Sequence, residues 1–150
     1  MAKNMIVRLD NVAGTKVGSL VKSIKYYDSA DAVAEVQNGV FVEVGELVAG
    51  EREVHKAVDA TEADENVAII CNPEVIYDQN GLGDSDLGNY INGADEIIRA
   101  ILLHEGDIFS IANEAAAGAD KVFGSLTAKF QNTEKVGRYT YNCYEVVKTA

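Results

Sequence analysis

The sequence has no tryptophan, one proline, two histidines and two cysteines among its 150 residues. Neither Cys71 nor Cys143 lies in a C-x-x-C spacing, which argues against a structural zinc site and a disulfide scaffold. We interpret both as buried thiols in a reducing compartment. No apolar run approaches the roughly 18 residues of a membrane span, and the first residues lack the apolar core of a signal peptide.

Basic residues are outnumbered by acidic ones, and the net charge is −11. Residues 1–25 contain five basic residues and one acid, so residues 26–150 carry a net charge of −15. A body with that charge repels nucleic-acid phosphates and anionic membranes, and neither is expected as a partner. The composition is 47% hydrophobic and 25% charged, so the chain has enough apolar residues to form the buried core of one domain.

The basic N-terminal stretch differs from the rest of the chain. Its segment NVAGTKVGS is rich in glycine and small polar residues, which favours an extended arm over a packed element. We therefore divide the chain into an extended N-terminal arm, residues 1–22, and a single β-rich domain, residues 23–150. Two interpretations of the arm remain open, a solvated terminus and an arm that docks on an acidic partner.

Most of the remaining chain has the β-branched, aromatic and alternating composition of strands. Strands are predicted at Leu20–Asp28, Val40–Val44, Arg52–Val58, Val67–Cys71, Val75–Tyr77 and the segments 96–103, 107–112 and 137–148. Short helices are predicted at Ser29–Val36 and Ile111–Ala117. The predicted fold class is mainly β, a compact β-barrel or sandwich-like single domain with one or two short helices.

The predicted core follows from the apolar face of each predicted strand. It consists of Ile24, Tyr26, Val40, Val42, Val54, Val67, Ile69, Ile98, Leu102, Ile108, Tyr139, Tyr141 and Val146. A register shift by one residue would exchange the two faces of any of these strands.

The stretch RAILLHEGDIFSIANEA places His104, Glu105 and Asp107 within four residues, a composition that suits either a metal or acid–base site or a tight turn. Adjacent side chains of an extended strand point to opposite faces, so His104 and Glu105 would not converge on one ion. Gly106 can adopt a positive φ, and Asp107 can accept a hydrogen bond from a nearby backbone N–H. The sequence therefore favours a hairpin turn, with Gly106 serving the turn and His104 not a ligand.

Other motifs of catalysis or ligand binding are missing. The stretch DQNGLGDSDLGN has calcium-loop character in Asp78, Asn80, Asp84 and Asp86, but it lacks the spacing and terminal glutamate of an EF-hand. No P-loop, dinucleotide-binding glycine motif or nucleophile elbow occurs. The sequence thus predicts no catalytic residue, no metal ligand and no cofactor, and an interaction or structural role.

Two blocks carry a resemblance. SIKYYDSADAVAEVQNGVFVEVGELVAGEREVHKAV (Ser23 to Val58) and YINGADEIIRAILLHEGDIFSI (Tyr90 to Ile111) resemble small proteins encoded beside the major capsid protein in tailed phages and prophages of Gram-positive bacteria. Those proteins are capsid decoration, or cement, proteins. The resemblance lies in the order of K-Y-Y, N-G-V-F-V and G-E-R-E-V-x-K, then I-R-A/G and G-D-x-F-S, and it covers somewhat over a third of the chain.

The resemblance implies a non-enzymatic virion protein that binds the outside of an icosahedral capsid and reinforces it. It would be made in the cytoplasm of the host bacterium, and its partners would be the major capsid protein and further copies of itself on the capsid. The alternatives are another virion component, such as a head-fibre base or tail-tube subunit, and a small metal-dependent enzyme that uses His104, Glu105 and Asp107.

The arm is the predicted capsid contact, because it carries the only basic excess of the chain. Its strand-forming piece would bury apolar side chains against the capsid or add a strand to an exposed sheet edge. The candidate capsid-binding residues are Lys3, Ile6, Val7, Arg8, Leu9 and Lys16. On this interpretation, the domain folds without residues 2–12.

Overall fold

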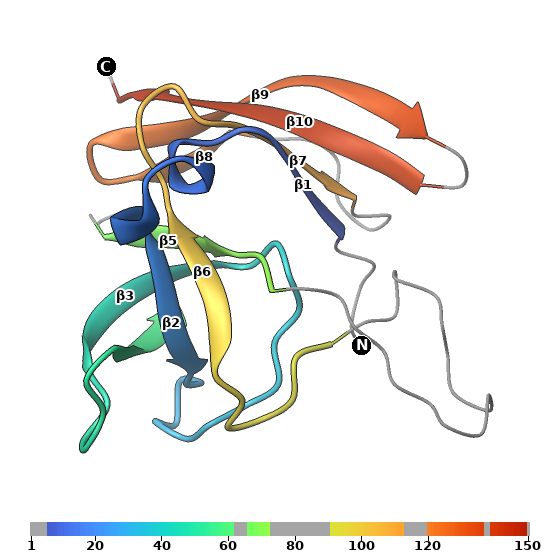
Figure 1. The fold of residues 1–150 in the computed structure, drawn as a ribbon. Coiled ribbons are helices and arrows are strands. Elements are labelled where there is room, and N and C mark those ends of the chain that lie inside the picture. Colours follow the sequence, from blue (N-terminus) through green and yellow to red (C-terminus); the bar gives the residue numbers. More distant parts are fainter. Residues whose placement is uncertain (1–5, 62–65, 73–90, 113–119, 137–138, 150) are drawn as a thin grey trace, which may run out of the picture.

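The computed structural model describes residues 6–61, 66–72, 91–112, 120–136 and 139–149 (Figure 1). Within them the chain is mainly β. The strands are β1 (Ile6–Asn11), β2 (Val21–Tyr26), β3 (Phe41–Leu47), β4 (Val54–Asp59), β5 (Val67–Ile70), β6 (Ile98–Leu102), β7 (Ile108–Ala112), β8 (Lys121–Phe123), β9 (Leu126–Val136) and β10 (Tyr139–Lys148). Two single-turn 3-10 helices, η1 (Ala13–Thr15) and η2 (Gly18–Leu20), lie between β1 and β2.

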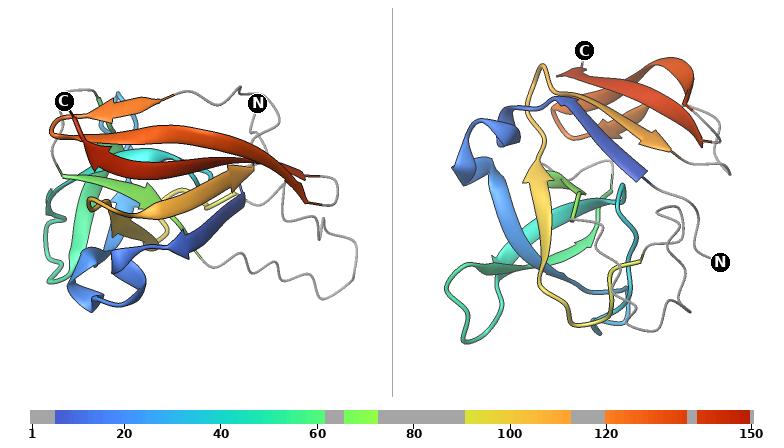
Figure 2. Two further views of the ribbon diagram at one scale, coloured as in Figure 1. Left: turned by 90° about the horizontal axis from the view of Figure 1, so that it is seen from above. Right: turned by 45° about the vertical axis from the view of Figure 1, so that its right-hand side comes forward.

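The strands form a closed barrel and an open sheet that lies across one side of it (Figures 1 and 2). The barrel order is β2-β4-β3-β5-β6, and the sheet order is β1-β7-β10-β9-β8. Among the described pairs, β2 and β4 run parallel and the others are antiparallel. This arrangement confirms the predicted fold class of a compact, mainly β single domain.

β5 forms a wall that is buried on both faces. Val67 and Ile69 pack into the core between barrel and sheet, whereas Ala68 and Ile70 point into the barrel. All four are at most 4% exposed. A strand covered on both sides needs apolar residues at consecutive positions, and the run VAII supplies them.

Aromatic side chains join the two layers. Phe41 of β3 lies 5.9 Å from Phe109 of β7 and 5.0 Å from Phe123 of β8, measured between ring centroids. Phe109 also stacks on Tyr144 of β10 at 5.6 Å. Such tilted and stacked pairs add to the free energy gained by burying the rings. Phe109 is fully buried and lies at the centre of this group.

The predicted core is correct at most positions. Those that are buried are Ile24, Val42, Val54, Val67, Ile69, Ile98 and Val146. Those partly buried against the barrel core are Tyr26, Val40 and Leu102. The Tyr139 side chain lies outside the described residues.

The predicted placement of Ile108 and Tyr141 in the core is wrong, because the opposite faces of their strands are the buried ones. Phe109 and Ile111 face the core in β7, and Tyr144 and Val146 do so in β10. The cause is that both alternating sets of these strands contain apolar or aromatic residues, so periodicity alone does not select the buried face.

The predicted helix at Ser29–Val36 is wrong. Val33 forms a β-bridge with Tyr27, Val36 forms one with Asn92, and Asp31 has a φ of +60°. The Asp28 carboxylate accepts hydrogen bonds from the N–H groups of Ala30 and Ala32, which stabilises a turn in place of a helix. For the predicted helix at Ile111–Ala117, Ile111 and Ala112 belong to β7 and the rest lies outside the described residues, as does the predicted strand Val75–Tyr77.

Replacing Phe109 with alanine tests the core between barrel and sheet. We expect Phe109→Ala to lower the free energy of unfolding by about 3–5 kcal/mol, because it opens a cavity among the stacked rings. Val122→Ala is the control, since Val122 is 39% exposed on β8. Urea unfolding would measure both, and equal midpoints for the two variants would contradict this view of the core.

Candidate functional site

Residues 104–107 form the turn that the sequence predicts. Gly106 has a φ of +95°, and the Asp107 N–H donates to the His104 carbonyl at 3.1 Å. His104 and Glu105 are exposed, whereas Asp107 is 2% exposed. The prediction that Gly106 serves a turn is therefore confirmed.

The expectation of a hairpin at this turn is wrong, because its two flanking strands do not pair with each other. β6 pairs with β2 and β5 in the barrel, whereas β7 pairs with β1 and β10 in the sheet. The turn carries the chain from one layer to the other. Its backbone groups pair with β10 instead: Gly106 N–H donates to the Val146 carbonyl, and Val146 N–H donates to the Asp107 carbonyl, both at 2.8 Å.

The Asp107 carboxylate accepts two backbone N–H groups. Its Oδ2 accepts the His104 N–H at 2.7 Å, and its Oδ1 accepts the Ala13 N–H of η1 at 2.9 Å. The second bond ties the start of the chain to the turn between the layers. In the described part of the chain, no group of three or more His, Cys, Asp or Glu side chains is placed to hold a metal ion. The Asp78–Asp86 loop lies outside the described residues.

The N-terminal segment is part of the folded domain from residue 6, so the boundary predicted at residue 22 is wrong. β1 pairs with β7 from Ile6 opposite Ala112 to Asn11 opposite Ile108. After β1, Val12 is 1% exposed in the core, and a Cβ on Gly14 would lie 2.2 Å from a methyl of Ile101. Removing residues 2–12 would strip a strand from the sheet, contrary to the expectation that the domain folds without them.

The candidate capsid-binding residues of this segment have partners within the chain. Ile6 is 8% exposed, and Val7 and Leu9 pack against the core between barrel and sheet. Lys16 donates to the Asn11 side chain at 3.3 Å. Lys3 lies outside the described residues. Ile6 is therefore buried, and Val7 and Leu9 are partly buried, within the domain itself.

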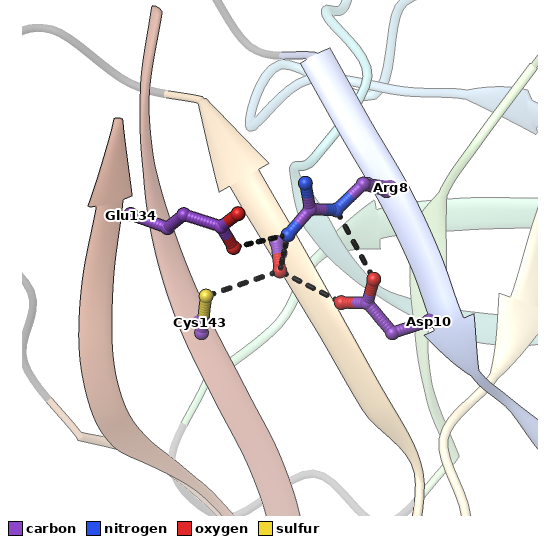
Figure 3. Close-up of polar contacts among 5 residues, drawn as sticks. Arg8, Asp10, Glu134 and Cys143 are labelled. Atoms are coloured by element: carbon purple, nitrogen blue, oxygen red, sulfur yellow. Dashed lines mark hydrogen bonds and ion pairs between the residues drawn. The ribbon is translucent and has the colours of Figure 1, made fainter. Parts of the chain in front are cut away.

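Arg8 is the centre of a polar network on the outer face of the sheet (Figure 3). Its guanidinium contacts the Asp10 carboxylate at 3.1 Å and reaches over two strands to Glu134 of β9 at 2.8 Å. The hydrogen bond to Glu134 is the main cause that raises the pKa of Arg8. The guanidinium also lies 4.9 Å from the centroid of the Tyr141 ring.

Ser110 completes this network beneath Arg8. Its hydroxyl donates to Asp10 at 2.8 Å and lies 3.3 Å from the Cys143 sulfur. Among the described residues, the side chains that contact the Ser110 hydroxyl are Arg8, Asp10 and Cys143. The network therefore fastens β1 to β7 and β9, and sequence reasoning missed it because Arg8 and Glu134 are 126 residues apart.

Charge is divided unevenly between the two layers. The described residues of the barrel and its loops, 21–61, 66–72 and 91–105, contain eleven acidic and five basic residues. The described residues that accompany the sheet, 6–20, 106–112, 120–136 and 139–149, contain five acidic and six basic residues. The barrel thus carries a net charge of −6 and the sheet layer one of +1.

Comparisons with known proteins identify no relative. No family model matches the chain, no curated protein matches it, and no solved structure matches it. Among the described residues, no helix is long and apolar enough to cross a membrane.

Replacing Gly106 with valine tests the turn. We expect Gly106→Val to lower the free energy of unfolding by about 1–3 kcal/mol, because a β-branched residue is strained at a φ of +95°. Nothing lies within 4 Å of a Cβ added there, so the loss would be conformational and not a steric clash. Gly18→Val is the matched control, since its site is also open and its φ is not positive. Equal thermal stability of the two variants would refute the argument.

Removing the Asp107 carboxylate tests the tie to the N-terminal segment. We expect Asp107→Ala to cost about 1–3 kcal/mol of stability for each N–H left without its acceptor. The amides of Ala13 and His104 should exchange with deuterium faster, because both donate to this carboxylate. Glu105→Ala is the control, as Glu105 is exposed in the same turn. Unchanged exchange at Ala13 in Asp107→Ala would show that the carboxylate does not hold the segment.

Proposed function

We propose that this chain is a capsid decoration protein, which binds the outer surface of the major capsid protein lattice and stabilises the head. The observation that carries the proposal is the order of short sequence pieces in residues 23–58 and 90–111, which resembles that of decoration proteins. Those blocks contain β3 and β6 entirely and most of β2, β4 and β7. The resembling pieces therefore build most of the barrel, the turn that leads from the barrel to the sheet, and most of the sheet strand β7.

The distribution of charge supports this proposal. A decoration protein needs one side that binds a shell and a remaining surface that stays in solution. Here the two layers differ by seven units of net charge over the described residues. The acidic excess favours solubility and repels nucleic acid, so the protein would not compete for packaged DNA.

Contact through an exposed sheet edge is disfavoured. The barrel is closed, and the open edges of the described sheet are β1 and β8. β1 has a register shift between Leu9 and Asn11 and the charged pair Arg8–Asp10, and β8 is three residues long and begins with Lys121. Bulges, charges and short length all oppose the addition of a strand. We therefore assign the capsid contact to side chains on the surface of the domain, and not to backbone pairing between an edge strand and the capsid.

Binding to undecorated capsids tests the function. We expect the purified protein to co-sediment saturably with emptied capsids, assembled from the major capsid protein encoded beside it, and to raise the temperature at which they disassemble. Capsids already decorated to saturation are the control. Absence of co-sedimentation at both low and high salt would contradict the proposal, and assembly of the protein alone into rings or tubes would favour a tail-tube subunit.

A further inference from the structure

A hollow of about 500 Å³ opens at one end of the barrel. It lies where β2 and β4 end, because these parallel strands place Tyr26 and Asp59 at the same end. Its lining is Tyr26, Glu35, Val36, Gln37, Val40, Asp59 and Ile91. Val36, Val40 and Ile91 form the apolar part of this lining, which we call the floor, and the carboxylates of Glu35 and Asp59 belong to the same lining.

A second hollow of about 310 Å³ adjoins the first at Asp59. It is lined by Asp28, Ser29, Asp31, Val58 and Asp59. No basic side chain belongs to the described lining of either hollow, although Lys56 pairs with Asp31 at the edge of the second one. We call the two hollows together the barrel-end groove.

Two of the carboxylates of the groove, those of Asp59 and Asp28, are held in place by hydrogen bonds. Asp59 accepts a hydrogen bond from the Tyr26 hydroxyl at 2.7 Å. Burial, followed by this bond, raises the pKa of Tyr26, so the phenol remains the donor and Asp59 the acceptor. Asp28 accepts two backbone N–H groups of its own turn. Glu35 is exposed at the rim.

A hydrogen-bonded cluster of asparagine side chains lies behind the floor of the groove. Asn38 is 1% exposed, and its amide donates to the Asn72 carbonyl at 2.9 Å, while its Oδ1 accepts Asn92 Nδ2 at 3.1 Å. Asn92 also pairs through its backbone with Val36 and follows Ile91 in the chain, and Asn38 lies two residues from both Val36 and Val40. The floor is therefore pre-organised, and a ligand would not have to order it.

The chemistry of the groove selects its occupant. Lys and Arg side chains bury an aliphatic stem along apolar surface and keep a charged head at its edge. The floor suits the aliphatic stem, and the carboxylates of Glu35 and Asp59 suit the charged head. A divalent ion is disfavoured, since the described part of the chain has no cluster of three His, Cys, Asp or Glu side chains placed to bind one.

We propose that the barrel-end groove is a docking site for a basic polypeptide segment of the partner protein, with a lysine or arginine seated between Val40 and Ile91. The inference rests on the proposed function, in which the partner is the major capsid protein. It assigns the capsid contact to the acidic barrel, where opposite charge favours association. A second basic side chain of the same segment would meet Asp28 and Asp59 in the adjoining hollow.

Charge-neutralising variants test the groove on capsids. We expect Glu35→Gln combined with Asp59→Asn to weaken binding to undecorated capsids about tenfold or more, since two of the facing carboxylates are lost. The amide oxygen that Asp59→Asn introduces would still accept the Tyr26 hydroxyl. The control is Glu46→Gln with Glu105→Gln, an equal charge change at exposed positions outside the groove, which should bind within about twofold of the wild type. If Asp59→Asn reduces stability, the single variant Glu35→Lys repeats the test at an exposed position.

If the groove variants bind capsids as well as the wild type does, the inference is overturned, whereas the proposed decoration function is not. Failure of the wild type to bind would overturn the decoration function, and a second experiment then tests the groove alone. In this experiment, the peptide Lys-Val-Lys-Val-Lys is titrated into the full chain, and the backbone amide chemical shifts are followed by NMR. Shifts concentrated at residues 26, 35–40, 59 and 91 would support the groove, whereas scattered or absent shifts would refute it. Dimerisation that the groove variants abolish would assign the groove to a second copy of the chain, contrary to the inference.

Discussion

The burial of β5 on both faces is the constraint on which the rest of the molecule depends. Its alternate residues belong to two different cores, so the barrel cannot close without also creating the surface that the sheet must cover. β6 is divided in the same way, with Ala100 facing the barrel interior and Ile101 facing the sheet. The barrel interior has a core of its own, but the outer side of the barrel and the inner side of the sheet share a second core. We therefore expect the two layers to unfold in one cooperative step.

The same constraint explains why the N-terminal segment is not an arm. Val12 fills the core between the layers, and the bond from the Ala13 N–H to Asp107 fixes the segment at the point where the chain passes from barrel to sheet. The basic charges of this segment are used within the chain, as Arg8 bridges Asp10 and Glu134. The basic excess that suggested an acidic partner is, at Arg8, matched by acids of the chain's own sheet.

Local features were predictable from the sequence and long-range ones were not. Gly106 supplies the positive φ and Asp107 accepts the N–H of nearby His104, so residue type alone indicated the turn. The bonds of the same two residues to Val146 and Ala13 are long-range, and the sequence did not indicate them. Alternation located β2 and β3, but it could not choose the buried face of β7 or β10, where both faces carry apolar residues. The barrel-end groove joins Tyr26, Asp59 and Ile91 from three separate segments, and no spacing in the sequence relates them. The helix expected at 29–36 failed because Asp28 offers the backbone a turn instead.

The order of strands in the sheet also sets how the domain responds to tension. β1 and β10 lie on either side of β7 and run in the same direction, because each is antiparallel to β7. The described chain leaves the sheet at Ile6 on one end and at Lys148 on the other. A pull between these two points therefore slides β1 and β10 past β7 in opposite senses, across hydrogen bonds that lie perpendicular to the strands. All of those bonds are strained together and none can open first, so the domain is built to resist stretching along its own length.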